Sequence, residues 1–323
     1  MELWHDRILV LDFGSQYTQL IARRIREAQV YSQILPCTVP LATVLAYRPK
    51  GIVLSGGPSS VYDKKAPSVS KQLFEQGIPI LGICYGMQLV THLQGGEVEK
   101  APHREFGRAE LTLDDRSDLF KGIGTRGSTV VWMSHGDRIE RMPPGFRSIA
   151  HTDNSPIAAM KRHDARQRIY CLQFHPEVAH TTEGATILKN FVYDICGCKP
   201  TWTMRSYVDT AVEQIRQQVG TERVICALSG GVDSSVAAAL THRAVGDQLT
   251  CIFVDNGVLR TGERDQVEKT FASQMHLNMR ILDRTSQFLT GLKSVTDPER
   301  KRKIIGRLFI KNFEVESKKL KGI

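Results

Sequence analysis

The chain has 323 residues, of which 41% are apolar and 24% are charged. This composition is enough for ordinary hydrophobic cores and excludes a disordered chain, and the length fits about two domains of ~100–200 residues each. No run approaches the ~18–20 uninterrupted apolar residues of a membrane span, and the start of the chain has no apolar stretch followed by a cleavage site. We therefore expect a cytoplasmic protein that is not exported and does not bind a membrane.

The net charge of +9 would fit a nucleic-acid partner. However, the basic excess is concentrated in residues 296–323, which hold nine basic and four acidic side chains, and the rest is closer to balance. A basic segment beside a nucleotide site serves phosphate binding equally well. The charge alone does not decide, and we expect no nucleic-acid partner.

The seven cysteines are an odd number and lie mostly in apolar segments, which argues against a disulfide framework and for a reducing compartment. Cys196 and Cys198 are the only close pair. Because no second pair stands at zinc-ligand spacing, we interpret these two as structural.

In the first part of the chain, short apolar runs rich in β-formers alternate with helical patterns. Strands are expected at 7–13, 51–57 and 78–84, with helical segments at 17–29, around 68–77 and at 85–93. This alternation predicts a mostly parallel sheet with helices on both faces. From 97 to 173 the pattern changes to short strands, at 108–113, 128–133 and 168–174, which predicts an antiparallel extension of the same domain.

A domain boundary is expected near 196–203, where Gly and Pro interrupt the periodicity after a helix at 185–195. A helix at 207–220 then leads into a strand at 224–228, a Gly-rich loop, a helix at 236–245 and a strand at 249–257. The predicted fold class is therefore α/β, with two doubly wound, mostly parallel sheet domains at residues 7–199 and 200–323.

Cys84 lies in the sequence Gly-Ile-Cys-Tyr-Gly, between the strand at 78–84 and the following helix. A Gly-x-nucleophile-x-Gly turn holds the nucleophile on a sharp corner, and the positive end of a helix favours the reactive thiolate. The alternative is that Cys84 is a small buried hydrophobic residue, as free cysteines usually are.

Two further segments favour the nucleophile. His175 ends an apolar strand and Glu177 follows two residues later, so the pair supplies a base and a group to orient it. Ser55-Gly56-Gly57-Pro58 ends another strand, where consecutive glycines can turn backbone N–H groups toward an oxyanion; the alternative is a plain turn before Pro58.

Together, the Cys84 elbow, the His175–Glu177 segment and the Gly-Gly loop resemble the class I (triad) glutamine amidotransferases, over about residues 7–199. The resemblance implies that Cys84 attacks the glutamine carboxamide, that His175 acts as base and then acid, and that Glu177 orients it. It also implies an oxyanion hole from the N–H groups of Gly57 and Tyr85, and a glutamine-holding role for Gln88.

A second motif, Ser-Gly-Gly-Val-Asp-Ser-Ser, joins the strand at 224–228 to a helix. Its residues are Ser229, Gly230, Gly231, Val232, Asp233, Ser234 and Ser235. A Gly-rich loop entering a helix presents N–H groups and the helix dipole to an anion. The Walker A ending is absent. The alternative is an ordinary helix N-cap with a flexible approach.

This heptad resembles the PP-loop of ATP pyrophosphatases, which implies an adenine nucleotide alpha hydrolase-like fold that grips the departing pyrophosphate of ATP. Asp233 is then a plausible ligand of the accompanying Mg²⁺, because a hard cation beside phosphates favours a carboxylate. Val254, at the end of the next strand, falls where the adenosine of a doubly wound nucleotide site is expected.

A triad glutaminase followed directly by a PP-loop domain resembles the GMP synthase family. Segments that also match it include Trp-Met-Ser-His-Gly-Asp at 132–137 and the basic segment at 297–306. The resemblance implies a carbon–nitrogen ligase that uses glutamine, ATP and XMP in guanine nucleotide biosynthesis, and a homodimer. Arg302 and Lys303 would contact phosphate or XMP from a lid over the ATP site, the alternative being a solvated basic helix start.

GMP synthases continue past position 323, so the resemblance implies that the PP-loop domain is incomplete here and that a C-terminal dimerisation domain is missing. Two other functions remain open at this point. One is a glutaminase subunit or regulator whose PP-loop half is vestigial. The other is an RNA-modifying PP-loop protein, favoured only by the basic tail.

Overall fold

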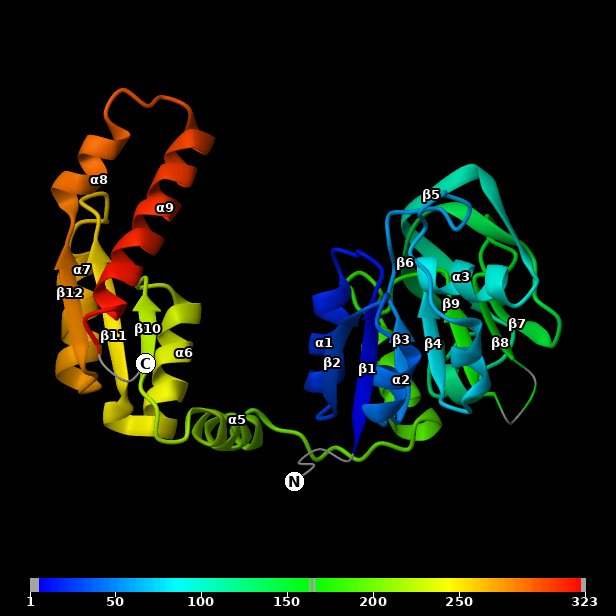
Figure 1. The fold of residues 1–323 in the computed structure, drawn as a ribbon. Helices are drawn as coiled ribbons and strands as arrows, with labels where there is room; N and C mark the ends of the chain where they lie inside the picture. Colours follow the sequence, from blue (N-terminus) through cyan, green and yellow to red (C-terminus); the bar gives the residue numbers. More distant parts are fainter. Residues whose placement is uncertain (1–5, 163, 165–166, 321–323) are drawn as a thin grey trace. The chain divides into compact units, whose positions relative to one another are not determined.

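A computed structural model describes residues 6–162, 164 and 167–320. The chain divides into two compact units, Met1–Thr203 and Met204–Ile323. Each unit contains its own sheet (Figure 1).

The first unit contains a nine-stranded sheet in the order β2-β1-β3-β4-β9-β8-β7-β5-β6. The five strands from β2 to β9 run parallel, and the strands from β9 to β6 pair antiparallel. The strands are β1 (Arg7–Asp12), β2 (Tyr31–Pro36), β3 (Gly51–Leu54), β4 (Ile80–Ile83), β5 (Glu97–Leu113), β6 (Ser128–Arg141), β7 (Phe146–His151), β8 (Ala159–Arg162) and β9 (Ile169–Leu172).

Helices cover both faces of the parallel part, as the alternating pattern predicts. One face buries apolar side chains of α1 (Thr18–Glu27) and α4 (Gly184–Lys189), the latter continuing as the π-helical η3 (Asn190–Ile195). The other face buries α2 (Leu41–Ala46) and α3 (Tyr85–Leu93). The remaining elements are the short 3₁₀ helices η1 (Lys71–Glu75) and η2 (Asp118–Phe120).

Two expectations for the first unit need correction. The segment at 168–174 is not part of an antiparallel extension alone, because β9 also pairs in parallel with β4 and so completes the parallel half of the sheet. In addition, β5 and β6 are long strands of 17 and 14 residues that extend well beyond the short segments predicted at 108–113 and 128–133. They pair with each other along most of their length.

The second unit contains a three-stranded parallel sheet in the order β10-β11-β12. Its strands are β10 (Val224–Leu228), β11 (Leu249–Asp255) and β12 (Met279–Asp283). Its helices are α5 (Met204–Val219), α6 (Val232–Val245), η4 (Gly246–Gln248), α7 (Glu263–Val267) with its continuation η5 (Glu268–Gln274), α8 (Thr285–Leu292) and α9 (Pro298–Ser317).

This sheet is also covered on both faces, which confirms the predicted α/β fold class. Residues of α6, α7 and η5 pack with Phe253 on one face, and residues of α8 and α9 pack with Ile252 and Val254 on the other. The helix after the Gly-rich loop begins at Val232, four residues earlier than predicted, so most of the serine-rich motif forms its first turn.

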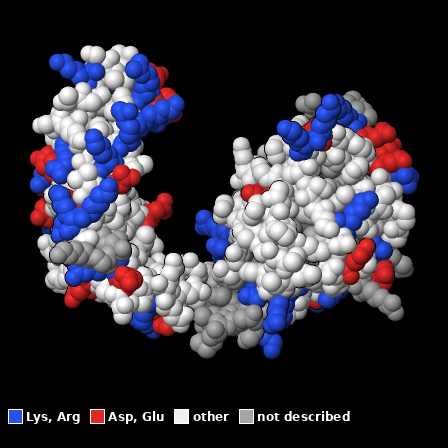
Figure 2. Space-filling model, in the orientation of Figure 1, with Lys and Arg blue, Asp and Glu red and all other residues white. Residues whose placement is uncertain are grey.

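Lys and Arg side chains gather along α9 (Figure 2). Among the residues that the structure describes, no helix is both long enough and apolar enough to cross a membrane.

Candidate active site

Cys84 occupies the corner between β4 and α3. Its φ of 51° and ψ of −104° lie outside the regions that non-glycine residues favour, so the backbone is strained at Cys84. A Cβ on Gly86 would lie 2.4 Å from the Leu54 carbonyl oxygen, and one on Gly82 would lie 2.8 Å from the carbonyl carbon of Gly86. The two flanking glycines are therefore required by the close approach of β3, β4 and α3.

His175 follows β9, and Glu177 comes two residues later. Their side chains are buried, with exposed fractions of 5% and 0%, and His175 Nδ1 lies 2.7 Å from Glu177 Oε1. The histidine backbone is fixed as well, because its N–H donates to the Trp132 carbonyl and its carbonyl accepts a hydrogen bond from the Thr181 hydroxyl. Because Nδ1 faces Glu177, the other ring nitrogen, Nε2, points away from the glutamate.

The structure brings Cys84 and His175 together. A Cβ built on Gly56 would lie 3.2 Å from His175 Cε1 and 3.7 Å from Cys84 Cβ, so both side chains border the Gly-Gly loop after β3. Burial lowers the pKa of His175, but hydrogen bonds and charge interactions with Cys84 and Glu177 outweigh burial and raise the pKa from 6.5 to about 10. The imidazolium form is thus favoured beside the sulfur at neutral pH.

A cavity of about 370 Å³ opens at Cys84. It is lined by the loop after β3, by α3 and by the β6 segment Ser134–Asp137. The Cys84 thiol lies 3.6 Å from the Ser134 carbonyl oxygen, which can accept its proton in a hydrogen bond. The volume and lining suit a small polar substrate held against the sulfur.

The proposed oxyanion donors, Gly57 and Tyr85, lie side by side. A Cβ on Gly57 would lie 3.4 Å from the ring of Tyr85. Within the described part of the chain neither backbone N–H has a protein acceptor. Gln88 is buried in the same cavity wall, and its amide donates to the Asp137 carbonyl oxygen at 3.0 Å.

Sequence reasoning assigned no role to several other residues at this site. The fully buried Gln173 places its amide nitrogen 3.9 Å from Cys84 Sγ. His135 lines the cavity and pairs with the buried Glu105 on the neighbouring strand. In the sequence, His135 stood out only as a member of the segment at 132–137 that matches the GMP synthase family. No local sequence pattern indicated a role for Glu105.

In the second unit, the Gly-rich loop closes on itself through its hydroxyl groups. Ser229 and Ser234 exchange a hydrogen bond of 3.0 Å, and Ser235 donates to the Gly231 carbonyl at 2.7 Å. Gly230 has a φ of +76°, which glycine adopts without strain. This arrangement fixes the loop at the N-terminus of α6, where the first N–H groups of the helix have no intrahelical acceptor.

The remaining predicted residues lie in different settings. Asp233 is exposed in the first turn of α6 and makes no ion pair among the described residues. Val254 is buried in β11, one residue beyond the last β10–β11 pair, Leu228–Phe253.

The basic segment forms the first turns of α9. The cap is Asp297, whose carboxylate accepts a hydrogen bond from the Arg300 N–H. Arg302 pairs with Glu299 at 2.9 Å, and both Arg302 and Lys303 are exposed. The structure does not bring these two basic residues together with the Gly-rich loop through any described contact.

Comparison with known protein families identifies the class to which this fold and site belong. A family profile described as glutamine amidotransferase class-I matches residues 9–195, more than half of the chain. The chain belongs to the class-I glutamine amidotransferase family. A second profile, described as NAD synthase, matches residues 204–302.

The chain is also similar to particular members of this class over nearly its whole length. It is 53% identical to the glutamine-hydrolysing GMP synthase of Carboxydothermus hydrogenoformans and 54% identical to that of Geobacillus kaustophilus, each across 98% of this chain. It spans 62% of the length of both relatives. A solved structure from Thermoplasma acidophilum, described as one subunit of a GMP synthase, is 29% identical with a TM-score of 0.50, covering 60% of this chain and 94% of that one.

Proposed function

We propose that this chain provides the glutaminase and ATP-using parts of a GMP synthase. The observation that carries the proposal is the strained Cys84 elbow beside the buried His175–Glu177 pair, in a chain more than 50% identical to GMP synthases over 98% of its length. The matching relatives are longer than this chain. We therefore propose the whole reaction, and a homodimer, for a protein of their length.

In the first half-reaction, the Cys84 thiolate attacks the carboxamide carbon of glutamine, while the imidazolium of His175 holds the thiol proton. The N–H groups of Gly57 and Tyr85 stabilise the oxyanion. The proton on His175 passes to the departing nitrogen, which leaves as ammonia, and a thioester forms. His175 then takes a proton from water, which attacks the thioester and releases glutamate. Glu177 keeps the ring oriented through both steps.

In the second half-reaction, XMP displaces pyrophosphate from ATP through its C2 oxygen and becomes adenylylated. Ammonia then displaces AMP to give GMP. The loop at 229–235 would hold the departing pyrophosphate, with β11 near Val254 against the adenosine. Bound Mg²⁺, held by Asp233, would offset the phosphate charge. Arg302 and Lys303 would contact phosphate or XMP after a movement of α9.

The test measures glutamate, GMP, AMP and pyrophosphate from glutamine, XMP and ATP. It is run on the 323-residue chain and on a version extended to the length of its relatives. Cys84→Ala should abolish glutamate release and, in the extended protein, glutamine-dependent GMP formation. GMP formation from added ammonium should remain. Loss of both activities in Cys84→Ala would contradict the division of roles.

Glutamate release without any ATP-dependent adenylylation in the extended protein would instead favour a glutaminase subunit with a vestigial second unit. The similarity to a separate GMP synthase subunit over 60% of the chain makes this the second candidate. Neither function requires a nucleic acid or a membrane as partner.

A further inference from the structure

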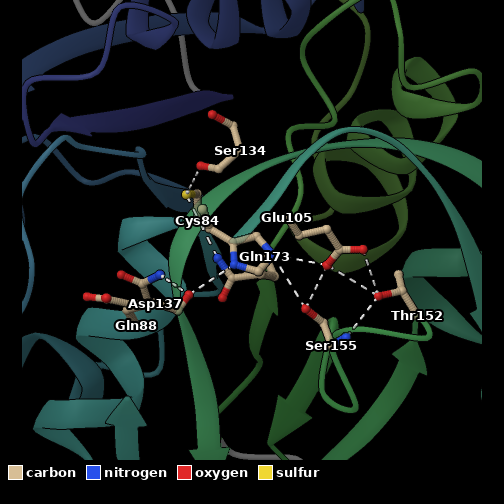
Figure 3. Close-up of polar contacts among 9 residues, drawn as sticks. Cys84, Gln88, Glu105, Ser134, Asp137, Thr152, Ser155 and Gln173 are labelled. Carbon is tan, nitrogen blue, oxygen red and sulfur yellow. Dashed lines mark hydrogen bonds and ion pairs between the residues drawn. The ribbon is translucent and has the colours of Figure 1, made fainter. Parts of the chain in front are cut away.

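A buried polar network lies directly behind the wall of the Cys84 cavity. Glu105 of β5 and His135 of β6 are opposite each other in the sheet register, and Glu105 Oε2 lies 3.3 Å from His135 Nε2. Ser155 and Thr152 donate their hydroxyls to the same carboxylate, at 2.9 Å and 3.0 Å (Figure 3). All four residues are buried, with exposed fractions of 2–8%.

The contacts of His135 hold its ring at both nitrogens. Its Nδ1 lies 3.1 Å from the Asp137 carbonyl oxygen, and its Nε2 faces the Glu105 carboxylate. The Ser155 hydroxyl lies 3.4 Å from the same Nε2, so the ring is enclosed by polar groups on both sides. Burial raises the pKa of Glu105, but its hydrogen bonds with His135, Ser155 and Thr152 outweigh burial and lower it below its ordinary value. The carboxylate form of Glu105 is therefore favoured at neutral pH.

The Glu105–His135 pair connects to the cavity through one carbonyl group. The Asp137 oxygen accepts hydrogen bonds from both His135 Nδ1 and Gln88 Nε2, while the Ser134 oxygen at the other end of the segment faces the Cys84 thiol. The Asp137 end of the segment Ser134–Asp137 is therefore held by two side chains. It forms one wall of the cavity into which the Cys84 thiol opens.

We propose that Glu105 is a positioning residue for the substrate: its carboxylate holds the His135 ring, and His135 in turn fixes the Asp137 carbonyl and the cavity wall that glutamine contacts. This assignment rests on the proposed glutaminase function. Without the carboxylate, the Ser155 hydroxyl would be the remaining described contact of His135 Nε2. The ring could then turn, and the Asp137 carbonyl and the wall would no longer be fixed.

The test is Glu105→Gln, which keeps the side-chain size and removes the charge. Losing a charge-assisted hydrogen bond in a buried site corresponds to about tenfold to hundredfold in binding, so KM for glutamine should rise by about tenfold or more, with kcat within about threefold. The matched control is Glu110→Gln, an exposed carboxyl on the same strand that pairs with Ser128, and its KM should not change.

Two alkylating probes distinguish positioning from general damage. Iodoacetamide needs only an accessible thiolate, whereas 6-diazo-5-oxo-L-norleucine must bind as glutamine does. In Glu105→Gln the rate of Cys84 labelling by the glutamine-shaped probe should fall about tenfold relative to labelling by iodoacetamide. Ser155→Ala removes one donor to Glu105. It should raise KM and lower the labelling ratio as Glu105→Gln does, but by a smaller factor. This second variant keeps the test valid if Glu105→Gln folds poorly.

Suppose that the wild-type chain is active and that neither Glu105→Gln nor Ser155→Ala changes KM or the probe ratio. This result would overturn the positioning role and leave the glutaminase function in place. Equal losses with both probes would overturn it too, since they indicate a damaged thiol environment. A wild-type chain that releases no glutamate and resists the glutamine-shaped probe would overturn the proposed glutaminase function, and this role with it.

Discussion

His175 Nδ1 lies 2.7 Å from Glu177 Oε1, in a pocket so closed that the glutamate side chain has no exposed surface. The second carboxylate oxygen, Oε2, has no hydrogen-bond partner in the described part of the chain. A buried carboxylate with an unpaired oxygen is costly unless a positive charge compensates it. The charged form of His175 provides that compensation, so each residue of the pair sets the state of the other.

Glu177→Gln should therefore reduce kcat far more than it affects KM. The amide cannot support a positive His175, and it can turn an N–H toward the ring and favour the wrong tautomer. Loss of the orienting carboxylate in comparable triads costs about 10²–10⁴-fold, and we expect a kcat loss in this range. Steady-state glutamate release measures it. Glu99→Gln, an exposed carboxyl on β5, is the control and should retain full activity.

The same pair should make stability depend on pH in a defined direction. Folding raises the pKa of His175 from 6.5 to about 10, so the native state binds this proton more tightly than the unfolded chain does. The stabilisation is complete below pH 6.5, decreases as pH rises above it, and is lost as pH passes the folded value. The expected decrease is on the order of 3 kcal/mol between pH 6.5 and 9.

Urea unfolding followed by tryptophan fluorescence measures this effect, because all three tryptophans lie within residues 1–203. The stability difference between wild type and His175→Gln should be larger at pH 6 than at pH 9.5. His92→Gln, at an exposed histidine on α3, should give a difference that does not vary in this way. A His175 difference that is constant with pH would show that its charge does not contribute to folding.

The parts of the site that sequence predicted are those encoded over a few residues. The elbow at Cys84 and the His175–Glu177 pair are local patterns, and the structure brings them together beside Gly56 because parallel strands end there. The network behind Asp137 was not predictable in this way. Glu105 and His135 are thirty positions apart, and only the register of β5 on β6 makes them neighbours.

The errors in the predicted strands β5 and β9 have similar causes. In β5, a register irregularity between Lys100 and Glu105 and several charged side chains conceal the alternation expected of a strand, so only its second half was predicted. Every residue of β9 is buried, which is typical of a central parallel strand. That signal was present in the apolar run at 169–172, but sequence order alone placed β9 with its antiparallel neighbours.

Gly86→Ala tests whether the elbow depends on close backbone approach. The new methyl group would lie 2.4 Å from the Leu54 carbonyl oxygen, so α3 must shift away from β3. Overpacking of this kind costs about 1–3 kcal/mol, and we expect a loss in that range by tryptophan-monitored unfolding, with slower alkylation of Cys84. Gly306→Ala, in the interior of α9 with nothing within 4 Å, should instead stabilise its helix by about 1 kcal/mol, seen as slower amide exchange.

Asp233→Asn tests the proposed cation site in the second unit. The carboxylate is exposed at the start of α6 and makes no ion pair among the described residues, so removing its charge should not disturb the fold. If Asp233 holds Mg²⁺ beside the phosphates, the variant should bind Mg·ATP about tenfold more weakly, because one charged ligand of the cation is lost.

The metal-free measurement gives the opposite expectation and makes this test specific. Without Mg²⁺, the carboxylate only repels the phosphates, so Asp233→Asn should bind ATP in excess EDTA at least as tightly as wild type. Titration calorimetry under both conditions measures the two affinities. Asp247→Asn, an exposed carboxyl at the other end of α6, should change neither value. Weaker binding with and without the metal would mean that Asp233 acts through the loop itself, because a side chain that serves only as a cation ligand cannot weaken a complex that contains no cation.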